Sequence, residues 1–212
     1  MEPLLYEHLH GFVYNCNTCL TRCDAKSKLQ YHFGADAAFS ERFENYLINR
    51  INQNTALPFT AQKTTQPGYP DIALYQKTTG NNCIAFIEVK VQTRTFMTIQ
   101  NHLPQANLYP SETIALNQSD LLRYFTIKEQ TQLPLFIAWA LLNRPCVLKT
   151  EKVQYYHQEA DLLQQIFRHY QNLRRFRRQS GQGDVVEGQH KGVVVNYHFS
   201  LSELVPGLPL GL

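Results

Sequence analysis

Apolar residues recur at three- and four-residue spacing along the run FSERFENYLINRIN, residues 39–52. Such spacing gathers the apolar side chains on one side of a helix. Ser40 stands where an N-cap residue is favoured, and the acidic Glu41 follows in the first turn. The pattern therefore predicts an amphipathic helix that begins near Phe39.

Downstream of this helix the pattern becomes typical of strands. We predict strands over 59–65, 70–76 and 83–91. Pro67 and Gly68 mark a turn before the second strand, and the run KTTGNN between the second and third strands is rich in turn residues. The last two strands should therefore form an antiparallel hairpin.

Helix-like and strand-like patterns alternate beyond residue 92. A proline interrupts the first helical run, and the continuous apolar run LPLFIAWALL predicts a buried strand. The expected elements are a broken helix over 96–109, a strand over 112–117, a helix over 120–130, the buried strand over 133–142, a helix over 159–179 and a strand over 193–199. This order predicts an α/β sandwich around a central mixed sheet.

The length of 212 residues suits one domain with additions, since a domain typically takes about 100 to 200 residues. We divide the chain into a cysteine-containing lead-in (1–35), an α/β core that ends in a basic helix (36–178), and a loop with a C-terminal strand and tail (179–212). No apolar run approaches the ~18 residues of a membrane span, and the N-terminus lacks an apolar signal-peptide core. We expect a soluble, cytoplasmic protein without a membrane partner.

Three charged residues, Asp71, Glu88 and Lys90, lie within the apolar pattern of the predicted hairpin. Strand alternation directs Glu88 and Lys90 to the same face, and hairpin pairing brings Asp71 alongside Glu88. Two carboxylates so placed repel each other unless a cation lies between them, and oxygen ligands suit Mg²⁺ or Mn²⁺. A metal ion with a lysine beside it matches the needs of phosphodiester hydrolysis.

The residues PD at positions 70–71 and EVK at positions 88–90 resemble the signature of the PD-(D/E)xK nuclease superfamily, the fold of many restriction endonucleases and archaeal Holliday junction resolvases. The resemblance covers roughly residues 38–142. It implies a restriction-endonuclease-like α/β/α sandwich with a central mixed β-sheet. In that family the two acids are metal ligands and the lysine is catalytic, so the resemblance assigns these roles to Asp71, Glu88 and Lys90.

An acidic residue on the preceding helix is often a further metal ligand in this family, and Glu44 stands in the matching place, with Glu41 as the alternative. The resemblance thus implies a Mg²⁺- or Mn²⁺-dependent DNA nuclease of the restriction, repair or defence type. Many nucleases of this fold act as homodimers. The competing interpretations are an inactive or recruiting nucleic-acid-binding module with the same fold, and a protein of another kind in which EVK is accidental.

Arginines are densest at the end of the helix predicted over 159–179, although the formal net charge is only +3. The candidate nucleic-acid-binding residues are Arg168, Arg174, Arg175, Arg177 and Arg178, together with Arg94 beside the hairpin. Such a patch would neutralise backbone phosphates without reading sequence. The alternative is a solvated helix end, whose cations favour the C-terminal end of the helix dipole.

Three of the five cysteines lie close together in the lead-in. Cys16, Cys19 and Cys23, with His32, could bind Zn²⁺ or an iron–sulfur cluster, since C-x-x-C is a common ligand spacing. No second C-x-x-C is present. Reduced thiols without a ligand are therefore the competing interpretation.

Overall fold

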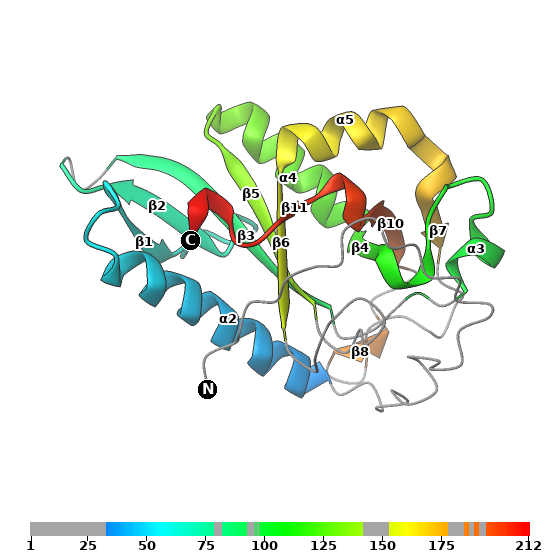
Figure 1. The fold of residues 1–212 in the computed structure, drawn as a ribbon, viewed down its shortest axis with the longest axis horizontal. Coiled ribbons are helices and arrows are strands. Elements are labelled where there is room, and N and C mark those ends of the chain that lie inside the picture. The colour runs from blue at the N-terminus through cyan, green and yellow to red at the C-terminus, as the bar shows by residue number, and fades with distance from the viewer. Residues whose placement is uncertain are drawn as a thin grey trace.

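The computed structural model in Figure 1 describes residues 33–78, 82–92, 96, 98–141, 153–177, 185–186, 189–190 and 194–212. Its centre is a sheet with the strand order β1-β2-β3-β5-β6-β11. The strands are β1 (Phe59–Lys63), β2 (Ile72–Gln76), β3 (Cys83–Gln92), β5 (Leu135–Leu141), β6 (Gln154–Glu159) and β11 (Val205–Pro206). Because β3 and β5 are parallel and the other pairs are antiparallel, the sheet is mixed.

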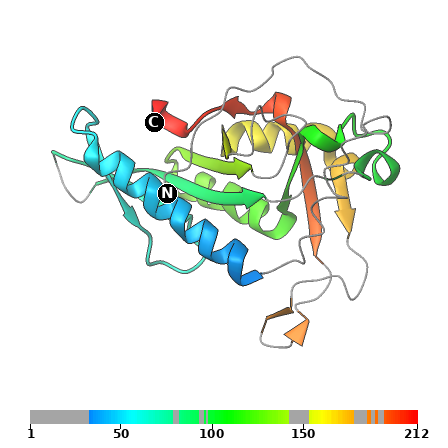
Figure 2. The ribbon, with the colours of Figure 1, turned by 60° about the horizontal axis from the view of Figure 1, so that its bottom comes forward.

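Helices cover both faces of this sheet. Figures 1 and 2 show α2 (Phe33–Gln53) on one side, and α4 (Gln118–Thr131) with α5 (Ala160–Tyr170) on the other. The predicted fold class, an α/β/α sandwich with a central mixed sheet, is confirmed. The antiparallel hairpin and the buried strand, now β5, are confirmed as well.

Strand alternation divides the core into two layers. On β3, Ala85, Ile87 and Val89 belong to the cluster beneath α2, whereas Phe86 belongs to the cluster beneath α4 and α5. Successive side chains of a strand point to opposite faces, which produces this division. Glu88 and Lys90 follow Phe86 at two-residue intervals and therefore belong to the face that α4 covers.

A smaller antiparallel sheet, in the order β4-β10-β7, completes the fold beside α4. Its strands are β4 (Thr113–Asn117), β10 (Val195–Ser200) and β7 (Arg175–Arg177). The remaining elements are α3 (Ile99–His102), β8 (Val185–Val186), β9 (Gln189–His190) and the 3₁₀ helices η1 (Pro110–Glu112), η2 (Gln171–Arg174), η3 (Leu201–Glu203) and η4 (Pro209–Gly211). None of the helices in the described ranges is both long and apolar enough to span a membrane.

Two helix boundaries differ from the prediction. The first helix begins at Phe33, so Ser40 lies inside it and is not its N-cap. Three alanines between Phe33 and Phe39 explain the extension, because alanine has the highest helix propensity. In the run 96–109 the only helix among the described residues is the short α3.

The prediction of one basic helix over 159–179 is wrong at its C-terminal half. The α-helix ends at Tyr170, and Gln171 takes a positive φ of 44° that breaks the helical path. Arg175 then pairs with Tyr197 as β7 joins β10. Pairing with a strand that is distant in sequence therefore outweighs the local helical pattern.

Candidate active site

The hairpin of β2 and β3 carries its charged residues at its open end. Ile72 pairs with Ile87, so Asp71, one residue before β2, comes opposite Glu88. The N–H of Val89 donates a hydrogen bond of 2.8 Å to Asp71 Oδ2. The Asp71 carboxylate is thus held against the backbone of β3, next to Glu88.

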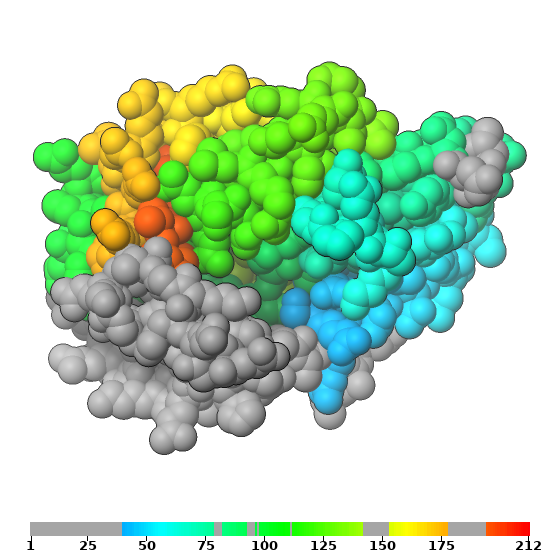
Figure 3. Space-filling model, turned by 180° about the vertical axis from the view of Figure 1, so that it is seen from behind, coloured from blue at the N-terminus to red at the C-terminus, as the bar shows by residue number. Residues whose placement is uncertain are grey.

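The segment before β2 fixes the position of Asp71 from the other side. The N–H of Thr64 donates to the Asp71 carbonyl at 2.9 Å, and the Thr64 hydroxyl donates to the Pro70 carbonyl. Gly68 has a φ of 81°, and a Cβ at this position would lie 3.6 Å from the Arg123 side chain. Figure 3 shows this segment in cyan beside α4 in green.

Glu88 is the centre of the charged cluster and is only 4% exposed. Its Oε1 lies 2.5 Å from Lys90 Nζ and accepts a 2.5 Å hydrogen bond from the Tyr124 hydroxyl. The Lys90 ammonium also lies 5.7 Å from the centre of the Tyr124 ring. The structure therefore brings Asp71, Glu88 and Lys90 together, with Tyr124 as a fourth member.

Helix α4 supplies residues that the sequence analysis missed. Arg123 Nη2 donates to the Tyr124 hydroxyl at 3.3 Å, and Arg123 Nη1 lies 3.0 Å from Asp120 Oδ1. The three residues stand at positions i, i+3 and i+4 of a helix that was predicted correctly. That spacing would have placed them on one side of the helix, although nothing in the sequence directed that side toward Glu88.

Burial and an excess of negative charge both act on the Asp71 carboxyl. Burial raises the pKa of the Asp71 carboxyl to about 7, and the negative charge of Glu88 adds to the increase. The N–H of Val89 and the ammonium of Lys90 act in the opposite direction without cancelling it. A cation at this point would therefore relieve an existing electrostatic cost.

Lys90 remains an ammonium in this environment. Burial is the largest single influence and would lower the pKa of Lys90, but the negative charge and hydrogen bond of Glu88, together with Tyr124 and Asp120, outweigh it, and the pKa is raised. Burial likewise raises the pKa of Tyr124, so its hydroxyl stays protonated and can donate to Glu88. Both groups are hydrogen-bond donors at neutral pH.

Glu44 lies at the edge of this cluster. It is buried on α2, and its Oε2 lies 2.8 Å from the Nζ of Lys63 on β1. The negative charge of Glu44 contributes to the raised pKa of Asp71 but is the weakest of the causes. Glu41 is exposed. Glu44 therefore affects Asp71 through its negative charge, but its direct contact is the ion pair with Lys63.

The acids of the cluster suit a metal that needs few protein ligands. Within the described residues, no group of three or more His, Cys, Asp or Glu side chains is arranged to hold a metal ion. Mg²⁺ is commonly bound by only one or two carboxylates, because it keeps several of its waters. Asp71 and Glu88 meet this smaller requirement.

Of the predicted basic residues that the structure describes, one is buried and three are exposed. Arg174 is 1% exposed, its Nη1 lies 2.6 and 2.7 Å from the two carboxylate oxygens of Glu203, and its Nε donates to the Ala106 carbonyl at 3.2 Å. The prediction that Arg174 contacts nucleic acid does not fit this burial. Arg168, Arg175 and Arg177 are exposed.

Several predicted site residues lie outside the described residues: Arg94, Arg178, Cys16, Cys19, Cys23 and His32. Gln92, the last residue of β3, has a structural role. Its amide donates to the Thr113 carbonyl at 3.3 Å and accepts the N–H of Ala115 at 3.2 Å. It thereby joins β3 to β4.

In comparisons with known proteins, similarity is found at the level of structure. No family model matches the chain, and no curated protein matches it. A solved structure of Hjc, a Holliday junction resolvase from Archaeoglobus fulgidus, is similar over 78% of this chain and 86% of its own, with 13% sequence identity and a TM-score of 0.39. At this TM-score the similarity says nothing about the activity of this chain.

Proposed function

We propose that this protein is a metal-dependent DNA nuclease of the PD-(D/E)xK type. The observation that carries the proposal is the meeting of Asp71, Glu88 and Lys90 at the open end of one hairpin. Two carboxylates face each other there with a single ammonium beside them. Ordinary strands do not retain such a charge set, because buried charges are costly unless they are compensated.

Asp71 and Glu88 would hold the metal, either Mg²⁺ or Mn²⁺, with Glu44 as a further carboxylate on the α2 side. When bound, the ion would polarise a phosphoryl oxygen and lower the pKa of a coordinated water. The Val89 N–H and the Tyr124 hydroxyl each engage one carboxylate and keep its orientation. Such orienting contacts commonly tune metal sites.

Lys90 would act as a fixed positive charge. Because its pKa is raised, it is a donor and not a base at neutral pH. It could hold an attacking water or a phosphate oxygen, and it would offset the negative charge that develops on the phosphoryl group. Its contact with Glu88 sets the distance between this charge and the proposed metal ligands.

The test is cleavage of supercoiled plasmid and branched DNA in Mg²⁺, and separately in Mn²⁺. Asp71→Asn and Lys90→Ala should each lower the rate by about 10²-fold or more, the scale for losing one transition-state contact. Asp161 and Lys128 form a 3.2 Å ion pair elsewhere on α4 and α5, so Asp161→Asn and Lys128→Ala are matched controls that should cleave like the wild type.

Cleavage that survives both substitutions in the hairpin would refute the site. DNA binding without any cleavage by the wild type would instead support the inactive or recruiting module. Nicking of the plasmid reports the first outcome, and a binding measurement on the same DNA reports the second.

A further inference from the structure

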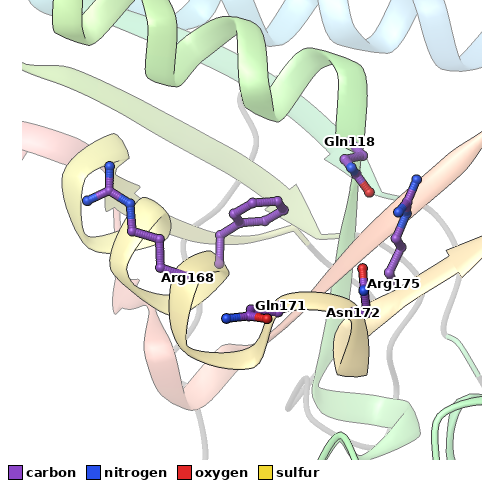
Figure 4. Close-up of a pocket in the computed structure, with 6 residues that line it drawn as sticks. Gln118, Arg168, Gln171, Asn172 and Arg175 are labelled. Atoms are coloured by element: carbon purple, nitrogen blue, oxygen red, sulfur yellow. The ribbon is translucent and has the colours of Figure 1, made fainter.

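A pocket of about 290 Å³ lies between the start of α4, the end of α5 and the segment after it. Its lining residues are Gln118, Phe167, Arg168, Gln171, Asn172 and Arg175 (Figure 4). We propose that the pocket binds one unpaired nucleotide of a DNA strand, with a phosphate on the arginines and the base against the amides and the phenyl ring. This inference rests on the function proposed above.

The two pocket arginines remain available for an anion. Within the part of the chain that the structure describes, Arg175 is exposed and has no ion-pair partner. Arg168 Nη2 lies 3.8 Å from Glu129 Oε1, a weak exposed contact that leaves its donors usable. Guanidinium groups bind phosphate oxygens with paired donors, so the chemistry of these two residues suits a phosphate.

The other walls of the pocket suit a base. The Phe167 ring packs against two other aromatic rings: its centre lies 4.7 Å from that of Tyr197 and 5.8 Å from that of Phe125. A ring held in this way offers an apolar surface on which a base can pack. The amides of Gln118, Gln171 and Asn172 supply both donors and acceptors for a base edge.

Gln118 gives an independent indication that the pocket takes a polar ligand. Its Oε1 is shielded from solvent and has no hydrogen-bond partner among the described residues. A buried acceptor without a partner is costly and uncommon in native structures. The Gln118 amide would have to turn for a donor on a bound base to satisfy this oxygen.

The backbone at Gln171 is shaped to build the pocket. Its φ of 44° with ψ of −124° is a conformation that residues with side chains rarely adopt. The resulting turn carries Asn172 and Arg175 across from Gln118, as Figure 4 shows. Strained backbone conformations concentrate at functional sites, since they persist only where the surrounding structure holds them.

The size and position of the pocket favour an unpaired nucleotide. Its volume is near the lower end of the ~300 to 1,000 Å³ typical of small-molecule sites, and so suits one base better than a base pair. Unpaired bases can turn out of the strand into such pockets. Gln118 and Tyr124 are six residues apart on α4, or about 9 Å along its axis. The pocket and the proposed active site therefore draw on residues within two turns of the same helix.

The experiment measures binding of a fluorescein-labelled single-stranded 12-mer by anisotropy in EDTA, which prevents metal-dependent cleavage. Arg168→Ala/Arg175→Ala should raise the Kd at least tenfold. The control Arg42→Ala/Arg50→Ala removes two exposed arginines from α2 and should stay within twofold of the wild type. An equal loss of affinity in both double variants, or no loss in Arg168→Ala/Arg175→Ala, would contradict the proposed nucleotide pocket.

A second variant separates the pocket from its charge. Asn172→Phe fills the space, keeps both arginines and lies at an exposed position. It should weaken single-strand binding at least fivefold and leave binding of a blunt duplex of the same sequence within twofold. Equal effects on the two ligands would contradict an unpaired nucleotide.

The binding assay stands apart from the cleavage assay. A wild type that cuts no DNA would sink the proposed function while the pocket variants still report on binding. Conversely, a wild type that cuts, together with pocket variants that bind the single strand normally, would sink the pocket alone.

Discussion

Two buried charge clusters in this molecule differ in their balance. In the first, Asp71 and Glu88 share one lysine, and the pKa of Asp71 is raised to about 7. In the second, Arg174 and Glu203 form a one-to-one pair at 2.6 Å. The Glu203 carboxylate also accepts the N–H of Ser200 at 2.9 Å within a capping box. In the balanced cluster each charge has an opposite partner. In the unbalanced cluster one negative charge remains without an opposite partner among the described residues, so a bound cation would be favourable there.

The largest effect on stability should follow from breaking the balanced pair. Arg174→Ala leaves Glu203 without its partner in a largely buried place, and such losses typically cost about 3 to 5 kcal/mol. Urea unfolding of the wild type and the variant measures the difference. Arg177→Ala, an exposed neighbour, is the control and should change stability by less than about 0.5 kcal/mol. A cost below about 1 kcal/mol for Arg174→Ala would show that the pair is not structural.

The unbalanced cluster predicts a pH dependence that Asp71 dominates. Because the folded-state pKa of Asp71 is raised from 3.8 to about 7, the folded state binds the extra proton between these values. Stability without metal should therefore fall as the pH rises from about 4 to about 7, by at most ~1.4 kcal/mol per pH unit. Denaturant unfolding in EDTA at a series of pH values measures this slope.

Asp71→Asn should flatten that slope and stabilise the protein above pH 7, because it removes the charge that burial opposes. Mn²⁺ added at pH 8 should stabilise the wild type and not the variant, since a ligand stabilises only the state that binds it. A slope that Asp71→Asn leaves unchanged would assign the titration to another group.

The smallest effect concerns the hydroxyl that α4 contributes. Tyr124→Phe removes the donor to Glu88 and should destabilise the protein by about 1.5 to 3 kcal/mol, the range for a hydrogen bond to a charged group. Tyr46→Phe, which loses only an exposed contact with Arg50, is the control. Thermal melting ranks the two. If both substitutions cost the same, Tyr124 does not support Glu88.

The sequence predicted the parts of the fold whose pattern is local. Period-two alternation located the hairpin and put Glu88 and Lys90 on one face, as the two core clusters bear out. The apolar run from Leu135 to Leu141 is a fully buried strand, as predicted. These features follow from the spacing of neighbouring residues, which the sequence states directly.

The strand β6 escaped prediction because two of its buried residues are glutamines, whose partners the local pattern does not reveal. Gln158 is buried and donates to the Glu203 carbonyl at 2.7 Å, 45 residues along the chain. Gln154 donates to the Tyr156 hydroxyl at 2.9 Å. Because glutamine is usually exposed, a run that contains two of them does not predict a buried strand unless their partners are known.

Residue spacing along the chain was enough to identify the side chains that could meet at the hairpin: Asp71 and Glu88 through pairing, and Lys90 through alternation. Which of the charges are compensated depends on how the elements pack. Arg174 and Arg175 are neighbours in the same basic run, yet one is buried on Glu203 and the other lines a pocket. Tyr124 contacts Glu88 only because α4 packs over β3. The physical reason is that local spacing fixes the direction of a side chain, whereas its partner comes from elsewhere in the chain.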